Sequence, residues 1–415
     1  MTIPVVLAFD PEYYFPTCVT VWSVMEQSDL KDQYCFFFLI SGEASDVDKG
    51  VFDAIAEKYS NFSYKYITVG AVFANIRRTV PHISVPTYYR LLIPEVVCEY
   101  DRCIYLDSDM IVFGNISRIL DECDATEGVS FNQCYLAAVR DMLMQVEELP
   151  WTKTHLDSIG FKDRQSYFNA GLLVLNLARM REDMMVDSFL ELSKNGYYFC
   201  DQDVLNIACA GKIRYLPARD NLVAPYIGNR YIAERAGLQG EDWRDTMQGR
   251  PFICHFAGPG KPWEQVETVW EYEWYERAKR LPQTEYVREQ LRVIEENKVD
   301  RWRDDLLPMV RRAGELILYG FSAAGYRLCR HLLAEGFTNI RCFCDRDTSK
   351  IGLSHEGIPC HGREILSGLP KDAMVIICPQ KSWREIYQDL IEAGVDKKKV
   401  ARFRGRDTRI VSLDQ

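Results

Sequence analysis

Two aspartates, Asp107 and Asp109, follow directly after an apolar run in the sequence RCIYLDSD at positions 102–109. The run 103–106 predicts a strand that is buried on both faces. In open α/β sheets, ligands bind at the carboxyl ends of the strands. Two carboxylates separated by one residue can converge there on a divalent cation that keeps open positions for phosphate oxygens. The alternative is a surface turn in which both aspartates cap backbone amides.

The segments before this pair predict a mainly parallel sheet. Residues 3–9, 34–40 and 62–67 are runs typical of strands, and helical patterns lie between them at 16–27 and 44–59. Strands that alternate with helices indicate a parallel sheet with helices on both faces. After the aspartate pair, we expect strands at 129–131, 172–177 and 252–256, a Met-rich amphipathic helix at 137–149, and a helix at 203–210.

Polar residues near the ends of these segments are candidates for a binding site. Asp10 and Tyr13 follow the first strand, where a carboxylate and a ring can bind a nucleotide base, although Asp-Pro also starts plain turns. His82 and Arg90 could both reach an anion near the aspartate pair; the alternatives are a loop histidine and an ion-pair residue. The small residues 170–171 would let a ligand approach the backbone.

Two later segments also carry candidate residues. Asp201 and Gln202 stand at the start of a predicted helix, where acidic residues are favoured even without another role. His255 could complete a metal site with the earlier carboxylates. The Gly/Pro loop at 257–263, which contains Lys261, suits a diphosphate.

Residues 314–415 repeat the α/β pattern on a smaller scale. A tight turn at 320–325 follows a predicted strand and opens a helix, and Asp345 stands twenty positions after Gly325. This resembles a dinucleotide-binding fingerprint, but Ser322 replaces the glycine that admits a pyrophosphate. Nucleotide binding and a structural or partner-docking role both stay open. The predicted strands are 315–319, 339–344, 374–378 and 400–403, and the predicted helices are 324–336 and 382–393.

The composition argues against several classes of protein. The chain has 415 residues and a net charge of −10, which argues against a general nucleic-acid binder. It contains no run of about 18 apolar residues, and its N-terminus lacks the basic start of a signal peptide. The 14 cysteines form no CxxC pair, so we expect the reducing cytosol. The charged, aromatic stretch 264–304 predicts a solvated helical connector, with contact to a membrane surface as the alternative.

Five of these segments, taken together, point to a known family. In their order and spacing they resemble glycosyltransferase family 8, the retaining group that includes bacterial lipopolysaccharide galactosyl- and glucosyltransferases. The resemblance covers about residues 1–270, and the run HxxGxxKPW is its most specific part. Residues 314–415 are similar to Rossmann-like units appended to some bacterial glycosyltransferases. The five segments are 8–10, 82–90, 107–109, 168–171 and 255–263.

The resemblance implies a fold and an activity. The fold is α/β: a glycosyltransferase type A domain, with one mixed, mainly parallel Rossmann-like sheet and helices on both faces, followed by a smaller Rossmann-like domain. We expect the catalytic domain at 1–275, a helical connector at 276–313 and the C-terminal domain at 314–415. The implied activity is metal-dependent retaining transfer of galactose or glucose from a UDP-hexose to a glycan acceptor, such as a lipopolysaccharide or surface polysaccharide.

The resemblance also implies roles for individual residues. Asp107, Asp109 and His255 would hold the divalent metal, usually manganese, against both phosphates. Ser108 would also contact the donor. The nucleoside would lie at Ala8, Asp10 and Tyr13, the diphosphate at Gly258 and Lys261, the phosphates and acceptor near His82, and the sugar at Arg90, Asn169, Ala170, Asp201 and Gln202.

Retention of configuration restricts the mechanism. Double displacement needs a carboxylate nucleophile on the far face of the sugar. The matching position holds Gln202, whose amide oxygen is a poor nucleophile, so the resemblance favours front-face substitution, with Asp201 as the alternative nucleophile. Two departures bear on other contacts. Glu12 replaces an uncharged polar residue, and Asn132 and Gln133 stand where the family often has a carboxylate, so the ribose contact and the acceptor can differ.

Other classes of function stay open. A non-catalytic UDP-sugar-binding protein would keep the nucleotide contacts without the metal triad. An NAD-dependent sugar-modifying enzyme would act through the C-terminal domain. We also expect a cytoplasmic location, with a homo-oligomer through the C-terminal domain and peripheral contact at the inner face of the membrane as further options. The sequence does not identify the hexose, the acceptor or the linkage.

Overall fold

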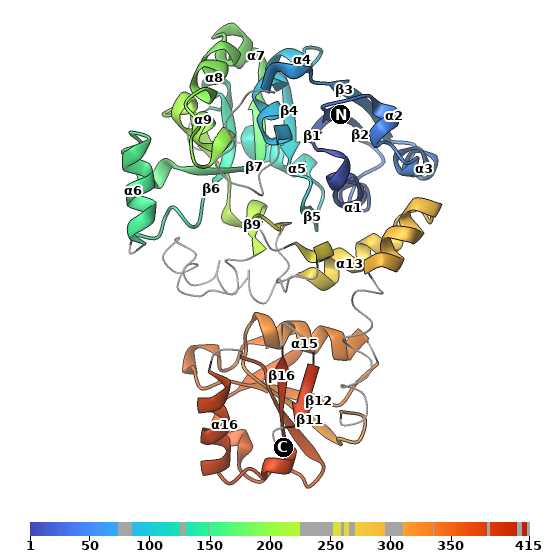
Figure 1. The fold of residues 1–415 in the computed structure, drawn as a ribbon, viewed down its shortest axis with the longest axis vertical. Helices are drawn as coiled ribbons and strands as arrows, with labels where there is room; N and C mark the ends of the chain where they lie inside the picture. The colour runs from blue at the N-terminus through green and yellow to red at the C-terminus, as the bar shows by residue number, and fades with distance from the viewer. Residues whose placement is uncertain are drawn as a thin grey trace. The chain divides into compact units, whose positions relative to one another are not determined.

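The computed structural model describes residues 1–73, 85–124, 130–147, 149–224, 252–258, 261–264, 270–294, 310–334, 336–379, 382–404 and 409–412. The chain divides into two compact units (Figure 1). Of the described residues, the first unit holds those within 1–224, 252–258 and 277–290, and the second holds those within 261–264, 270–276 and 291–412.

A seven-stranded sheet forms the centre of the first unit. Its strands are β1 (Thr2–Ala8), β2 (Gln33–Ile40), β3 (Phe62–Thr68), β4 (Arg102–Leu106), β6 (Leu136–Arg140), β7 (Phe168–Asn176) and β8 (Ile213–Tyr215), in the order β3-β2-β1-β4-β7-β6-β8. Strand β7 is antiparallel to both β4 and β6, whereas the other pairs are parallel. The beginning of β7 therefore lies beside the ends of β4 and β6, where Leu106 pairs with Leu172 and Arg140 with Phe168.

Helices cover both faces of this sheet (Figure 1). Side chains of a strand alternate between the faces. Phe37 of β2 joins a core formed with one group of helices, whereas the ring of Phe38 stacks on Phe52 at 4.3 Å on the other face. All twelve residues of α1 are buried. The helices are α1 (Tyr14–Met25), α2 (Ala44–Val47), α3 (Val51–Lys58), α4 (Ile93–Val96), α5 (Ser117–Asp124), α6 (Pro150–Ser158), α7 (Leu177–Glu182), α8 (Met185–Ser193) and α9 (Cys200–Cys209), with 3-10 segments η1 (Pro11–Tyr13), η3 (Val85–Leu92), η4 (Phe131–Gln133) and η6 (Ala218–Asn221).

A second, three-stranded sheet joins distant parts of the chain. It consists of β5 (Met110–Val112), β10 (Ile253–His255) and β9 (Leu222–Val223). Strand β10 pairs antiparallel with β5, so that His255 lies opposite Met110. This pairing brings the end of β10 next to the aspartates that precede β5.

The structure corrects three expectations about local structure. The predicted helix at 137–149 is wrong, because Leu136–Arg140 forms β6, which hydrogen-bonds to both β7 and β8. The predicted strand at 129–131 is also wrong over its described part, since Phe131 begins η4. The single helix at 44–59 is two helices, separated by a bend in which Gly50 has a φ of 74°. Pairing with neighbouring strands outweighs local helix preference at β6.

The second unit is a smaller α/β structure. Its sheet has seven strands in the order β13-β14-β12-β11-β15-β16-β17, with β12, β11, β15 and β16 parallel. The predicted C-terminal strands and helices are confirmed within a residue or two as β11 (Glu315–Tyr319), β12 (Ile340–Cys344), β15 (Ala373–Ile377), β16 (Val400–Arg404), α15 (Ala323–Ala334) and α16 (Trp383–Glu392). The sheet also contains β13 (Ser354–His355), β14 (Ile358–His361) and β17 (Arg409–Ser412), which were not predicted.

The tight turn after β11 is stabilised from within the unit. The carboxylate of Asp345 accepts hydrogen bonds from the backbone N–H of Phe321 at 2.8 Å, from that of Asp347 at 3.0 Å and from Lys350 at 3.1 Å. The side chain of Phe321 is buried against the edge of Tyr326, with ring centroids 4.8 Å apart. Asp345 is thus occupied in supporting the turn.

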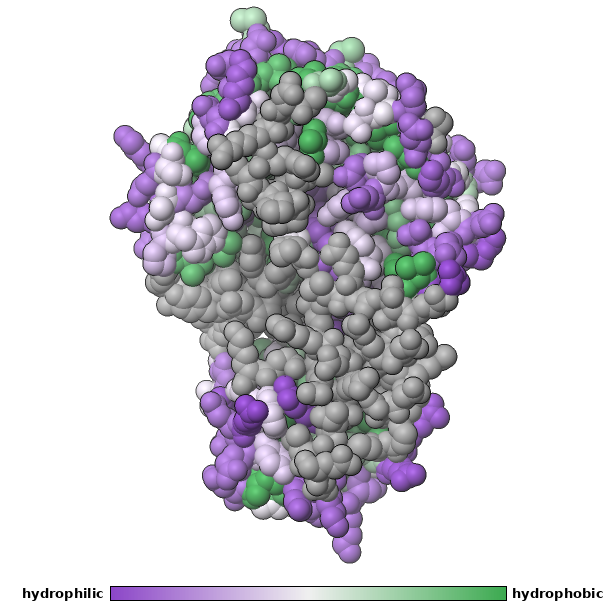
Figure 2. Space-filling model, viewed as in Figure 1, coloured by the Kyte–Doolittle hydropathy of each residue, from purple (hydrophilic) through white to green (hydrophobic). Residues whose placement is uncertain are grey.

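The described part of the face drawn in Figure 2 is mainly polar. Figure 2 shows mostly hydrophilic residues, with small hydrophobic patches between them, over the described part of the face that it presents. Among the described helices, none combines the length and the apolar character needed to cross a membrane.

A buried threonine in α1 holds the loop between β4 and β5. The hydroxyl oxygen of Thr20 lies 2.9 Å from the carbonyl oxygens of both Ser108 and Met110, and it accepts a hydrogen bond from the Met110 N–H at 3.2 Å. The loop contains Asp109, so this hydroxyl helps to set the direction in which the aspartate points.

We expect the substitution Thr20→Val to lower the free energy of unfolding by about 1–3 kcal/mol, because buried backbone groups lose their partner without a change in shape. Denaturant titration measures this change. The matched control is Thr154→Val at an exposed threonine of α6, whose hydroxyl donates to the Pro150 carbonyl. Equal losses in the two variants would contradict the assigned role of Thr20.

Candidate functional site

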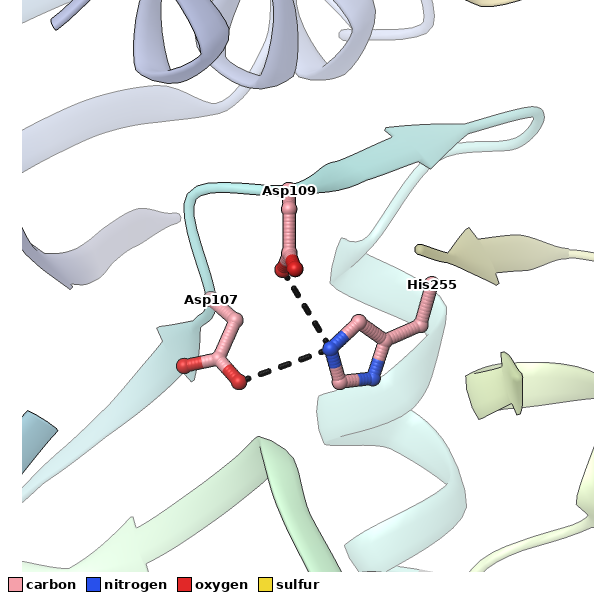
Figure 3. Close-up of side chains that lie close together, drawn as sticks. All are labelled: Asp107, Asp109 and His255. Atoms are coloured by element: carbon pink, nitrogen blue, oxygen red, sulfur yellow. Dashed lines mark ion pairs between the residues drawn. The ribbon is translucent and has the colours of Figure 1, made fainter. Parts of the chain in front are cut away.

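Three side chains that could hold a metal ion meet at the carboxyl end of β4 (Figure 3). Asp107 follows β4, Asp109 precedes β5, and His255 ends β10. The Nε2 atom of His255 lies 3.5 Å from Asp107 Oδ2 and 3.3 Å from Asp109 Oδ1. The ligand atoms of the three residues lie within 4.8 Å of one another. Two carboxylates and one imidazole form a donor set that fits a divalent cation such as Mn²⁺.

The backbone around these side chains is held in place. The Asp107 N–H donates to the Gly171 carbonyl at 2.8 Å, and the Phe256 N–H donates to the Asp109 carbonyl at 2.9 Å. Gly171 also leaves room for the imidazole. A Cβ atom at this position would lie 2.3 Å from His255 Cε1. The position of His255 therefore depends on the absence of a side chain at residue 171.

A buried arginine links Asp107 to the start of α9. The guanidinium of Arg90 lies 2.8 Å from Asp107 Oδ1, 2.9 Å from Asp201 Oδ2 and 2.5 Å from the Ala170 carbonyl oxygen. It also stacks 4.4 Å from the ring centre of Tyr105, whose hydroxyl donates to Asp107 Oδ1 at 2.9 Å. We call Arg90, Asp107, Ala170 and Asp201 the Arg90 cluster. The charge of the buried guanidinium is compensated within the cluster, because it faces two carboxylates.

Burial raises the pKa of Asp201 to about 6, although the Arg90 guanidinium and a hydrogen bond from Thr87 at 2.6 Å favour its charged form. Asp201 is 3% exposed. Thr87 was not a predicted site residue, and no pattern in the sequence marks it. It lies in η3, which the structure places against α9.

The amides of Gln202 and Asn169 meet a carboxylate that the sequence analysis missed. Gln202 accepts a hydrogen bond from the Ala170 N–H at 3.0 Å and donates to Asp141 Oδ2 at 3.3 Å, while Asn169 donates to the same oxygen at 3.2 Å. Asp141 follows β6 directly. Its signal in the sequence is an apolar run ending in aspartate, as at 103–107, which the incorrect helix at 137–149 concealed. Asp141 supplies a carboxylate after β6, and the difference in acceptor expected from Asn132 and Gln133 stays a prediction.

The remaining predicted residues are placed as follows. Ala8 ends β1, and its carbonyl oxygen lies 3.4 Å from the Ser108 hydroxyl. Asp10 caps η1 by accepting from the Tyr13 N–H at 3.2 Å. Gly258 follows β10 with a φ of 88°, and a Cβ there would meet nothing within 4 Å. Lys261 belongs to the second unit, where it is buried beside Trp263, and His82 lies outside the described residues.

We expect the substitution Gly171→Ala to weaken Mn²⁺ binding at least about tenfold, because the new methyl group displaces the His255 ring. Titration of Mn²⁺ followed by electron paramagnetic resonance measures the affinity, and thermal melting checks the fold. The control is Gly70→Ala, where an added Cβ meets nothing within 4 Å. An unchanged Mn²⁺ affinity in Gly171→Ala would exclude this role for the glycine.

The raised pKa of Asp201 predicts a pH dependence of stability. The folded chain binds a proton at Asp201 near pH 6, whereas the unfolded chain does so only near the ordinary value of 3.8. Stability of the wild type relative to Asp201→Asn should therefore increase by about 2 kcal/mol as the pH falls from 7 to 4.5. Urea titrations of both proteins across this range measure the difference, and parallel pH profiles would contradict the prediction.

Comparison with known proteins identifies the family. The family model "Glycosyl transferase family 8" matches residues 4–267. A putative glycosyltransferase of Haemophilus influenzae is 25% identical over 268 residues, covering 64% of this chain and 74% of that protein. The lipopolysaccharide 1,3-galactosyltransferase of Salmonella typhimurium is 23% identical over 260 residues, covering 61% and 71%. Several further relatives match over only about half of their own length.

A solved structure has the same fold. The galactosyltransferase LgtC, in complex with donor and acceptor sugar analogues, matches with a TM-score of 0.56 at 24% identity, covering 70% of this chain and 100% of LgtC. The mixed, mainly parallel sheet of the first unit is the glycosyltransferase type A fold, and a further α/β sheet forms the second unit. The predicted fold class is therefore confirmed. The chain belongs to glycosyltransferase family 8.

Proposed function

We propose that this chain is a metal-dependent retaining glycosyltransferase. It moves a hexose, galactose or glucose, from a UDP-sugar to a glycan acceptor such as a lipopolysaccharide or a surface polysaccharide. The observation that carries this proposal is the shared carboxylate of Asp107. Its Oδ1 accepts from Arg90 at 2.8 Å, while its Oδ2 faces His255 Nε2 at 3.5 Å. Asp107 thus belongs both to the proposed metal site and to the Arg90 cluster. In a UDP-hexose the diphosphate and the hexose are directly bonded, so the groups that bind them must also be adjacent.

Each part of the donor has candidate contacts. Asp107, Asp109 and His255 would hold Mn²⁺. When bound, such a cation neutralises charge on the departing diphosphate. The Arg90 cluster, with Asn169 and Gln202, would bind the hexose. The nucleoside and the phosphates would be contacted by Ala8, Asp10, Tyr13, His82, Ser108 and Gly258.

The hydrogen bonds around α9 support front-face substitution. A carboxylate nucleophile needs a free oxygen directed at the sugar. Asp201 Oδ1 accepts from Thr87 at 2.6 Å and its Oδ2 pairs with Arg90 at 2.9 Å, so both oxygens are engaged. The amide oxygen of Gln202 accepts from the Ala170 N–H and is a weak nucleophile. We therefore propose that the leaving phosphate itself accepts the proton of the acceptor hydroxyl.

The C-terminal unit offers less support for NAD chemistry. In a dinucleotide-binding unit, the acidic residue after the second strand binds the ribose. Here, Asp345 accepts three hydrogen bonds from its own unit, including the Phe321 N–H of the turn. This favours a structural or partner-docking role for the second unit, such as contact with a second copy of the chain.

We expect one UDP-hexose, either UDP-galactose or UDP-glucose, to raise the melting temperature only when Mn²⁺ is present. A ligand present at 100 times its Kd stabilises the folded state by about 2.7 kcal/mol. The same sugar should be hydrolysed slowly to UDP, because water can replace the acceptor, and EDTA should stop this release. Thermal melting and a coupled UDP assay measure the two effects.

The matched variants are Asp109→Asn, which should lose both effects, and Asp157→Asn at an exposed helix position, which should keep them. Binding without any UDP release would favour a non-catalytic UDP-sugar-binding protein. A glycosyl adduct trapped on Asp201 would contradict the front-face mechanism but leave the activity in place.

A further inference from the structure

A chain of side-chain hydrogen bonds runs from the sheet edge to the imidazole of the metal-binding group. Asn169 Nδ2 donates to Asp141 Oδ2 at 3.2 Å, and Asn221 Nδ2 donates to Asn169 Oδ1 at 2.9 Å. Asn221 Oδ1 then lies 3.0 Å from His255 Nδ1. Asn221 is 1% exposed and His255 is 3% exposed, so water does not compete at the last contact.

The direction of these hydrogen bonds, from donor to acceptor, follows from the contacts of the Asn169 side-chain amide. Asp141 Oδ2 accepts from Gln202 as well as from Asn169, so Asn169 must present its NH₂ group to it. Independently, the backbone N–H of Gly171 donates to Asn169 Oδ1 at 3.0 Å. The oxygen of Asn169 therefore faces Asn221, and the NH₂ group of Asn221 donates a hydrogen bond to it.

The consequence appears at the histidine. With its NH₂ group directed at Asn169, Asn221 presents its oxygen to His255 Nδ1, which must carry a hydrogen. A neutral imidazole protonated at Nδ1 has its lone pair on Nε2. Figure 3 shows that Nε2 faces Asp107 and Asp109, whereas the other ring nitrogen points away from them.

We propose that Asn221 is a positioning residue that holds His255 in the Nδ1–H tautomer, with Nε2 free to bind a cation, and that Asn169 sets the direction of the Asn221 amide. The hydrogen on Nδ1 is a property of the metal-free protein. Only its consequence for metal binding rests on the proposed function. No motif in the sequence marks Asn221, which reaches the site through η6, beside β9.

The tautomer can be measured directly. In protein with ¹⁵N-labelled histidine at pH 8.5, without metal, long-range ¹H–¹⁵N correlation spectra distinguish the two tautomers of each of the 6 histidines. The spectrum of His255→Gln assigns the signal of residue 255. We expect Nδ1 of His255 to carry a hydrogen, as its contact with Asn221 Oδ1 requires. A wild-type imidazole protonated at Nε2 alone would overturn the proposal, whether or not any variant folds and whether or not the protein transfers sugar.

Two variants separate positioning from simple packing. Asn221→Leu has a similar size but no acceptor, so the Nε2–H form should appear and Mn²⁺ binding should weaken about 10–100-fold. Asn221→Asp keeps an acceptor toward Nδ1 and should restore the Nδ1–H form. Asn195→Leu at an exposed position is the control and should match the wild type. A wild-type tautomer together with wild-type Mn²⁺ affinity in Asn221→Leu would show that Asn221 only fills space.

Discussion

The reversed direction of β7 is the constraint on which the candidate site depends. Because β7 is antiparallel to β4 and β6, its first residues lie at the same edge of the sheet as the last residues of those two strands. Asp107, Asp141 and Asn169 therefore meet, although they come from three separate segments. If β7 ran parallel to its neighbours, Asn169 would lie about 20 Å away, at the opposite edge.

Charge compensation explains why this edge can be largely closed to water. A buried arginine is costly unless carboxylates and further acceptors surround it. Arg90 has two carboxylate partners and a backbone carbonyl, and it stacks on the ring of Tyr105. These contacts fix Asp107 on one side and leave its other oxygen directed at His255. The proposed cation site and the proposed sugar site would thereby share one carboxylate.

Much of the fold was predictable because burial leaves a clear pattern in a strand. Continuous apolar runs such as 103–106 and 172–177 need cover on both faces, and both are central strands. This pattern did not identify the strand at 136–140, because its residues suit a helix and a strand about equally. Pairing with β7 and β8 makes the segment a strand. In the second unit, the fingerprint-like turn was found correctly, but the role of Asp345 depends on hydrogen bonds that no spacing reveals.

The sequence by itself determined which residues could bind a metal. These are two aspartates after a buried strand, and a histidine in a segment that resembles glycosyltransferase family 8. Only the tertiary structure brought His255 to within 3.5 Å of both carboxylates, through the pairing of β10 with β5. It alone also revealed Asp141 and Asn221. Their contributions are hydrogen bonds to residues far along the chain, and such bonds leave no local pattern because the folded backbone, not the spacing of residues, sets the distance between their atoms.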